Sequence, residues 1–381
     1  MLARSDRPLW ECYDVAVLDL DGVVYVGAEA VPGAPGHLAR VRDAGMQLAY
    51  VTNNAARPPS VVADHLSALG VPADASDVVN SAQAAARLLS DRLPAGSPVY
   101  VIGGLGLEEA LREQGLTPVQ ELAADPVAVV SGYNPDLRWR VVMNGAVLVA
   151  RGLPWVATNM DMSVPTDVGK APGNGVLVNA VASFAGREPE VAGKPLTPLF
   201  DETRIRVGGR RPLVIGDRLD TDIEGANAAG LDSLLVLTGV TGLRELVAAA
   251  PHQRPTYLAM DLAGLGEPHP APEGPGEAAA SDTGFVCGGW RAWVADAALH
   301  AAPVAGGTEH TAESHDSSAS GAAGAAPREA DWWRAIAAAA WHHLDDTGAA
   351  ASTDTLESPM SNGSVEGASR REEEGAEEQG P

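Results

Sequence analysis

The most constraining feature of the sequence is the stretch from Asp14 to Tyr25, where an apolar run ends in two aspartates and a glycine. Such a run predicts a buried strand that ends in a turn. Because side chains alternate along a strand, Asp19 and Asp21 leave it on the same side. The two carboxylates repel each other, so the pair makes sense if a divalent cation offsets the repulsion, or if one is a nucleophile and the other a proton carrier. The alternative is a solvated Asp-Gly turn.

A second predicted strand ends in Thr52, Asn53 and Asn54, with predicted helices on either side of it. Alternating strands and helices are typical of a parallel sheet, and ligands of such sheets sit beyond the carboxyl ends of the strands. We therefore expect Thr52 and Asn53 to lie near Asp19.

From about residue 81 the pattern is that of a second α/β unit. Its predicted strands are residues 98–102, 128–130 and 155–158. A glycine-rich loop after the first of them lacks the third glycine of a dinucleotide-binding fingerprint, because Glu109 stands there. Residues 159–175 have no predicted regular structure, and long loops of this kind are usually functional or mobile. We expect this loop, which includes Asp161, to face the substrate.

A later apolar strand, residues 212–216, breaks at a glycine into clustered carboxylates that include Asp217 and Asp222. Two separate acidic strand ends could supply ligands to one hard cation. Acidic residues at a helix N-terminus are the alternative interpretation. The only lysines of the chain are Lys170 and Lys194. A site that keeps lysine in an arginine-rich chain is expected to need a compact ammonium group.

The composition limits the partners of the protein. The 381 residues carry a formal net charge of −24, which argues against nucleic-acid binding, because such proteins have a cationic surface. Cys12 and Cys287 are far apart and form no metal-ligand spacing, so we expect neither a disulfide framework nor a zinc site. The sequence has no leader-like segment and no apolar run of about 18 residues. We expect a cytoplasmic protein without a membrane partner.

Four segments, in order, resemble the motifs of the haloacid dehalogenase-like (HAD) superfamily. They are residues 19–25, 51–54, 193–195 and 216–223. The insertion between the second and third motifs resembles the type IIA cap of the NagD and p-nitrophenyl phosphatase group. The resemblance extends over residues 13–266 and implies an α/β fold, with a doubly wound parallel-sheet core and an inserted α/β cap.

The resemblance also implies aspartyl-phosphate chemistry. Asp19 would attack phosphorus, and Asp21 would protonate the leaving alkoxide and then activate water. An acid/base at position 21 favours hydrolysis of phosphate monoesters over dehalogenation. The implied phosphate-binding and substrate-binding residues are Thr52, Asn53, Asn54, Lys194 and Asp161.

Mg²⁺ is the cofactor that the resemblance implies. Its ligands would be the carboxylates of Asp19 and Asp217 and the main-chain carbonyl of Asp21, with Asp222 acting through water. The implied partner is a small phosphate ester, and a homo-oligomer is left open.

The chain is expected to have a core in two parts and several further segments. The core is expected at residues 1–80 and 189–266, with the cap at 81–188 between its two parts. A Pro/Gly-rich linker is expected at 267–283, followed by a small accessory segment, 284–345, with tryptophans and an alanine-rich helix. A disordered acidic tail is expected at 346–381.

Among NagD-like proteins with a C-terminal extension, the chain most resembles glycerol 3-phosphate phosphatases. The predicted substrate loop has no stacking aromatic residue, which favours a small polyol or hydroxy-acid phosphate. Phosphoglycolate, nucleoside monophosphates or another sugar phosphate are alternatives, as is phosphotransfer to a second substrate. A non-catalytic binding or scaffold protein that uses the tryptophan-containing segment is the alternative from another class. The presence of Asp19, Asp21, Lys194 and Asp217 argues against that alternative.

Overall fold

The computed structural model describes residues 1–166, 169–274, 284–304, 328–354 and 356. The chain forms two compact units, Met1–Ala271 and Pro272–Pro381. None of the helices within the described ranges is both long and apolar enough to cross a membrane.

The first unit contains a six-stranded sheet in the order β15-β14-β13-β1-β4-β5, with all strands parallel. The strands are β1 Val15–Leu18, β4 Gln47–Thr52, β5 Val78–Asn80, β13 Pro212–Gly216, β14 Asp232–Val236 and β15 Tyr257–Ala259. From β1 the chain adds strands first toward β5 and later toward β15. This reversal places a topological switch point between β1 and β13, where open α/β sheets bind their ligands.

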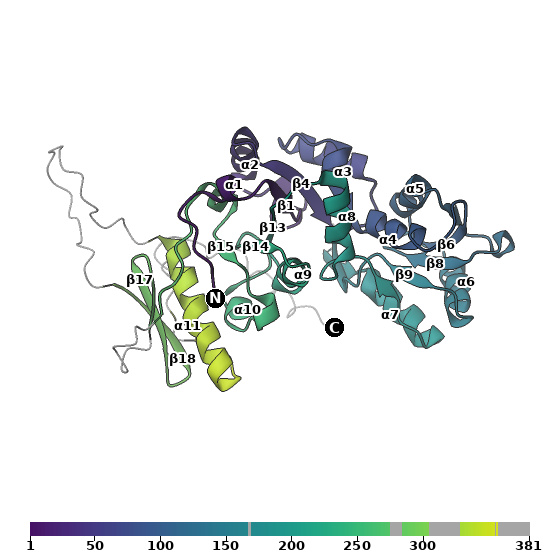
Figure 1. Ribbon diagram of the computed structural model, residues 1–381. Coiled ribbons are helices and arrows are strands. Elements are labelled where there is room, and N and C mark those ends of the chain that lie inside the picture. The colour runs from purple at the N-terminus through teal and green to yellow at the C-terminus, as the bar shows by residue number, and fades with distance from the viewer. Residues whose placement is uncertain (167–168, 275–283, 305–327, 355, 357–381) are drawn as a thin grey trace, which may run out of the picture. The chain divides into compact units, whose positions relative to one another are not determined.

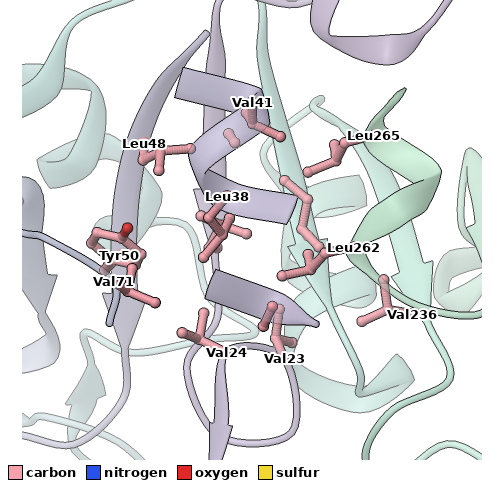
Figure 2. Close-up of a cluster of buried hydrophobic side chains, with 14 of the residues drawn as sticks. Val23, Val24, Leu38, Val41, Leu48, Tyr50, Val71, Val236, Leu262 and Leu265 are labelled. Atoms are coloured by element: carbon pink, nitrogen blue, oxygen red, sulfur yellow. The ribbon is translucent and has the colours of Figure 1, made fainter. Parts of the chain in front are cut away.

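Both faces of this sheet are covered by buried side chains, as the predicted doubly wound fold requires. Ala16 and Leu18 of β1 belong to one buried cluster, whereas Val15 and Val17 belong to another on the opposite face. Figure 2 shows part of the first cluster, where side chains of α2, β4 and the 3-10 turn Leu262–Gly266 meet. The helices of this part are α1 Leu9–Cys12, α2 Ala34–Asp43, α3 Pro59–Ala68, α8 Pro198–Val207, α9 Glu224–Ala228 and α10 Leu243–Val247.

A second parallel sheet, in the order β12-β9-β8-β6-β7, lies within the insertion of the first unit. Its strands are β6 Pro98–Ile102, β7 Thr117–Val119, β8 Ala128–Ser131, β9 Trp155–Ala157 and β12 Glu190–Val191. Its helices are α4 Ser81–Ser90, α5 Leu105–Glu113, α6 Trp139–Ala150 and α7 Asn174–Ala185 (Figure 1). We call this inserted part the cap. The α/β insertion predicted from the sequence is confirmed.

The alanine-rich helix α4 joins the two sheets into one apolar interior. Its buried residues Ala82, Ala85 and Leu89 pack in a cluster that includes Val17 of the core sheet and Val99 of the cap sheet. Small alanine side chains let a helix pack closely against its neighbours, and the cluster buries apolar surface from both sheets. The cap is therefore held against the core by burial as well as by polar contacts.

The prediction that residues 159–175 lack regular structure is wrong. They contain an antiparallel hairpin of β10 Ser163–Thr166 and β11 Gly169–Pro172. The prolines of this stretch argue against a central strand, but an isolated two-stranded ribbon has only edge strands, which tolerate proline. Thr166 Oγ1 also donates to the Gly169 carbonyl oxygen at 2.7 Å and so joins the two strands near the turn.

A shorter ribbon follows the first acidic motif. It pairs β2 Tyr25–Val26 with β3 Glu29–Ala30. Gly22 lies at its base with φ of +86°, a conformation that favours glycine. The ribbon thus closes the turn that carries Asp21.

The second unit has an antiparallel sheet of β16 Phe285–Cys287, β17 Trp290–Ala295 and β18 Ala298–Pro303, packed by helix α11 Glu329–Thr347. The alanine-rich helix predicted there is confirmed, and it buries Trp332 and Trp341. Most of the predicted linker, residues 275–283, and most of the predicted tail, residues 357–381, lie outside the described residues.

Candidate active site

Two acidic strand ends meet at the switch point of the core sheet. Asp19 follows β1 and Asp217 follows β13, and these strands pair with Leu18 opposite Ile215. Asp222 belongs to a π-helical turn, Leu219–Ile223, that comes directly after. Carboxylate oxygens of Asp19, Asp217 and Asp222 all lie within 4.8 Å of one another.

Lys194 reaches the same place from the loop after β12. Its ammonium donates to Asp19 Oδ1 and to Asp222 Oδ1, both at 2.6 Å, and its side chain is 4% exposed. Burial lowers the pKa of Lys194, but attraction to Asp19 and Asp222 outweighs this effect, so the pKa lies above its ordinary value. The ammonium therefore stays charged at neutral pH.

The carboxylates carry more negative charge than Lys194 can balance. Burial raises the pKa of Asp217 to about 7, and repulsion from Asp222 and Asp19 adds to the rise. Burial likewise raises the pKa of Asp222 to about 6 and that of Asp19 above its ordinary value, although Lys194 opposes both shifts. Three carboxylates around one ammonium favour binding of an additional cation.

Asp217 has the properties of a metal ligand. Its Oδ2 accepts from the Val240 N–H at 2.7 Å, whereas its buried Oδ1 has no hydrogen-bond partner among the described residues. A buried acceptor without a partner is costly unless an ion or water satisfies it. A Cβ at Gly239 would lie 2.0 Å from Asp217 Oδ2, and one at Gly22 would lie 2.5 Å from it. The two glycines leave room for the carboxylate, and the all-oxygen donor set fits Mg²⁺.

Asp222 is arranged differently from Asp217. Its Oδ1 accepts from Lys194, and its Oδ2 accepts from the Arg218 N–H at 3.2 Å. Both oxygens therefore already have protein donors. Asp222 is therefore less free than Asp217 to bind a cation directly, and its action through water stays a prediction.

Asp21 lies on the solvent side of the site and is exposed. Neighbouring protein atoms desolvate its carboxyl group and raise its pKa, while Lys194 and Arg57 oppose the rise. A carboxyl group with a raised pKa that remains in reach of water is suited to carry a proton.

The polar residues after β4 have distinct environments. Thr52 is buried, and its Oγ1 accepts from the Asn54 N–H at 3.1 Å. Asn54 is exposed, and its Oδ1 accepts from the Ala56 N–H at 3.0 Å. The Asn53 side chain instead turns toward Lys194 and the cap. This role could not be predicted from the sequence, because no local pattern links Asn53 with a residue 141 positions away.

Asp161 brings the cap to this edge of the core. Its Oδ1 accepts from Asn53 Nδ2 at 3.2 Å, and its N–H donates to Asn159 Oδ1 at 3.1 Å. Burial raises its pKa, and the hydrogen bond from Asn53 opposes the rise. The structure thus connects Asp161 of the cap, through Asn53, with Lys194 and the aspartates of the core.

Arg57 and Arg218 were not predicted as part of this site. Arg57 opposes the raised pKa of Asp21, and Arg218 opposes the raised pKa of Asp161. Arg57 lies outside the four motifs, and Arg218 lies within the fourth motif but is not singled out by its type, since nearly every basic position in this chain is an arginine.

The parallel-sheet core, the inserted cap and the lysine held among aspartates define a haloacid dehalogenase-like hydrolase, and the chain belongs to this family. A family model described as haloacid dehalogenase-like hydrolase matches residues 16–117, and a second HAD-hydrolase-like model matches residues 191–265. The matched segments carry the acidic motifs of the core, including Asp19 and Asp217.

Several named proteins are similar in sequence to the chain. A D-glycerol 3-phosphate phosphatase from Mycobacterium tuberculosis is 44% identical over 253 residues, which are 66% of this chain and 71% of that protein. An acid sugar phosphatase from Staphylococcus haemolyticus is 32% identical over 66% of this chain and 94% of its own length. A glycerol-3-phosphate phosphatase from Gallus gallus is 36% identical over 61% of this chain and 82% of its own length.

Solved structures support the same grouping. One similar structure is the crystal structure of a glycerol phosphate phosphatase from Mycobacterium tuberculosis in complex with magnesium. It has a TM-score of 0.75 and 36% sequence identity, and the match covers 88% of this chain and 92% of that chain. The crystal structure of a thermostable NPPase double mutant from Geobacillus stearothermophilus has a TM-score of 0.60 and 30% identity, and covers 66% of this chain and 96% of its own.

Proposed function

We propose that the protein is a Mg²⁺-dependent phosphatase that hydrolyses glycerol 3-phosphate through an aspartyl-phosphate on Asp19. The observation that carries the proposal is the position of Lys194 between Asp19 and Asp222, beside the unpartnered oxygen of Asp217. This arrangement can receive a phosphoryl dianion and a cation together. The Asp19 carboxylate remains available there as the nucleophile.

The first step forms a bond between an Asp19 carboxylate oxygen and phosphorus and breaks the ester bond between phosphorus and the leaving oxygen. Asp21 gives its proton to that oxygen, so the alcohol leaves neutral. The raised pKa of Asp21 favours the protonated form that this step needs. When bound, Mg²⁺ would supply charge stabilisation to the phosphoryl group; Asp19, Asp217 and the carbonyl of Asp21 would hold it.

The second step returns the enzyme to its starting state. Asp21, now ionised, takes a proton from water as the water oxygen bonds to phosphorus. The bond between phosphorus and Asp19 then breaks, and inorganic phosphate is released. Phosphate oxygens would be bound by the Thr52 hydroxyl, the Asn53 main-chain N–H and the Lys194 ammonium. Asn54, which is exposed beside them, is proposed as a further phosphate-binding residue.

The cap residue Asp161 favours a substrate whose leaving group carries hydroxyl groups. Asp161 presents a carboxylate at the core edge, and Asn53 engages only its Oδ1. A carboxylate accepts hydrogen bonds from hydroxyl groups and repels another carboxylate. Glycerol 3-phosphate suits such an acceptor better than phosphoglycolate does. Proteins similar to this chain carry the name glycerol-3-phosphate phosphatase.

The experiment that tests the substrate is a comparison of kcat/KM for four esters with Mg²⁺. These are glycerol 3-phosphate, phosphoglycolate, a nucleoside monophosphate and p-nitrophenyl phosphate. The proposal expects glycerol 3-phosphate to have the largest kcat/KM of the three metabolites. A larger value for phosphoglycolate would contradict it, and no phosphate release from any ester would favour a non-catalytic binding protein.

We also propose that the protein works in the cytoplasm. The two cysteines, Cys12 and Cys287, are far apart in the sequence and do not form the pattern of a disulfide framework, which agrees with a reducing compartment. Cell fractionation with detection of the tagged protein tests this location.

A further inference from the structure

The side-chain amide of Asn53 makes two hydrogen bonds to the main chain of Lys194. Asn53 Oδ1 accepts from the Lys194 N–H at 2.8 Å, and Asn53 Nδ2 donates to the Lys194 carbonyl oxygen at 3.1 Å. Asn53 is 8% exposed and Lys194 is 5% exposed. The side-chain amide of Asn53 thus bonds to both main-chain polar groups of Lys194, as the main chain of a neighbouring β-strand would. Both residues are buried.

We propose that Asn53 is a positioning residue, which holds the main chain of Lys194 so that its ammonium lies between Asp19 and Asp222. A lysine side chain is a flexible four-carbon stem, and its head can reach one place only if its base is fixed. The Lys194 ammonium is 2.6 Å from each of the two carboxylates. Asn53 therefore fixes the base of the side chain, and the carboxylates fix the head.

The side chain of Asn53 has no hydrogen-bonding hydrogen left for a phosphate. Its amide nitrogen carries two hydrogens, and it donates to the Lys194 carbonyl and to Asp161 Oδ1. Phosphate binding at this position is left to the main-chain N–H, which an alanine substitution preserves. The two roles of residue 53 can therefore be separated by mutation.

The residue before the lysine supports this arrangement. A Cβ at Gly193 would lie 2.6 Å from Asn53 Oδ1 and 2.6 Å from the Thr158 carbonyl oxygen. Real Cβ atoms do not approach other atoms so closely. The main chain before Lys194 can come this near to the Asn53 amide only because residue 193 is glycine.

Asn53 is itself held from the cap side. Its carbonyl oxygen accepts from Ser81 Oγ at 2.5 Å and from Asn159 Nδ2 at 2.6 Å. Asn159 and Ser81 are buried. A buried polar network with its bonds made is rigid, so Asn53 is a fixed support for Lys194.

This inference rests on the proposed function, and its test compares four variants. Asn53→Ala removes the two bonds to Lys194 and the bond to Asp161, and Asn53→Asp keeps the acceptor but removes the donor. Lys194→Ala and the double variant Asn53→Ala/Lys194→Ala complete a double-mutant cycle. Asn80→Ala is the matched control, because Asn80 is a fully buried asparagine that pairs with Thr52 in the next strand and caps α4. Its side chain donates to the Arg57 carbonyl rather than to Lys194.

Each variant is assayed for kcat and KM with glycerol 3-phosphate, phosphoglycolate and p-nitrophenyl phosphate, and its Tm is measured. A misplaced catalytic group costs about 100-fold in rate, so Asn53→Ala should lose about this factor in kcat with all three esters, while KM for p-nitrophenyl phosphate, whose leaving group has no hydroxyl for Asp161 to bind, changes little. Asn53→Asp should lose activity in the same uniform way. Asn80→Ala should lower Tm but keep kcat within about twofold of the parent value, as expected of a purely structural loss.

The double variant gives the sharpest result. If Asn53 acts through Lys194, adding Asn53→Ala to Lys194→Ala should leave the residual rate unchanged. A further loss of about 100-fold in the double variant would contradict the inference, as would a loss in kcat that differs strongly from one leaving group to another. An inactive parent enzyme would instead contradict the proposed function, because the inference concerns only how an active Lys194 is held.

Discussion

The ammonium of Lys194 lies 2.6 Å from the Asp19 carboxylate, although 175 positions separate the two residues in the sequence. The cap is inserted between them, so the core must close around the insertion before this contact can form. A lysine held against the proposed nucleophile offsets its charge and helps an anionic phosphate to approach. The contact therefore links the way the chain folds with the proposed chemistry.

Removing the charge of Lys194 should destabilise the protein as well as inactivate it. Lys194→Met leaves the buried Asp222 and the partly buried Asp19 without their counter-ion, and breaking a buried ion pair costs about 3–5 kcal/mol of unfolding free energy. Lys170→Met is the matched control, since Lys170 is the other lysine and is exposed. Chemical denaturation should show the loss for Lys194→Met alone. Equal stability of the two variants would contradict this prediction.

Metal-free protein should become less stable as the pH rises from about 5 to about 8. The pKa of Asp217 is about 7 and that of Asp222 about 6 in the folded protein, against 3.8 for an ordinary aspartate. Within this window the folded state binds more protons than the unfolded state, so the free energy of unfolding falls with pH.

Mg²⁺ should reverse this trend, because it binds the ionised carboxylates. Thermal unfolding with EDTA and with Mg²⁺, at each end of the pH window, measures both effects. The increase in Tm caused by Mg²⁺ should be larger at the higher pH, and Asp217→Asn should reduce it. The same Mg²⁺ effect at both pH values would count against a metal site at Asp217.

Gly239→Ala should weaken metal binding. The added Cβ would lie 2.0 Å from Asp217 Oδ2, so the carboxylate must move away from its present position. The Mg²⁺ concentration for half-maximal activity should rise by about tenfold or more, since one ligand is displaced. Gly36→Ala is the control, because a Cβ in that part of α2 meets nothing within 4 Å. A normal Mg²⁺ requirement in Gly239→Ala would contradict the prediction.

Asp161→Asn should change substrate preference more than catalysis. A hydrogen bond to a charged group contributes about 1.5–3 kcal/mol and one to a neutral group about 1 kcal/mol, so removing the charge should raise KM for glycerol 3-phosphate by about fivefold. KM for p-nitrophenyl phosphate, whose leaving group has no hydroxyl of this kind, should change far less. Steady-state kinetics with the two esters checks the prediction. An equal rise in both KM values would instead assign Asp161 to general binding or to the cap structure.

The acidic strand ends could be predicted from the sequence because their signal is local. An apolar run before Asp19 and another before Asp217 each predict a strand, and parallel pairing then brings the two ends together. The same reasoning placed Thr52 at the neighbouring strand end. These predictions depend on short patterns and on a rule of sheet geometry.

The remaining features depend on contacts that no local pattern reports. The bonds from Asn53 to Lys194 span 141 positions, and the cap contact with Asp161 spans 108. The hairpin of β10 and β11 was missed because proline lowers strand propensity, whereas a free ribbon tolerates it. The hydrogen bonds around Asp222 depend on a π-helical turn, which no local sequence pattern predicts.

The most direct test of the central claim is phosphate release from glycerol 3-phosphate by three matched samples. These are the parent protein with Mg²⁺, the parent protein with EDTA, and Asp19→Asn with Mg²⁺. The account predicts release in the first sample and a loss of at least about 1000-fold in the other two, because nucleophile and cation are both required. Undiminished release by Asp19→Asn, or in the presence of EDTA, would contradict a metal-dependent aspartyl-phosphate route.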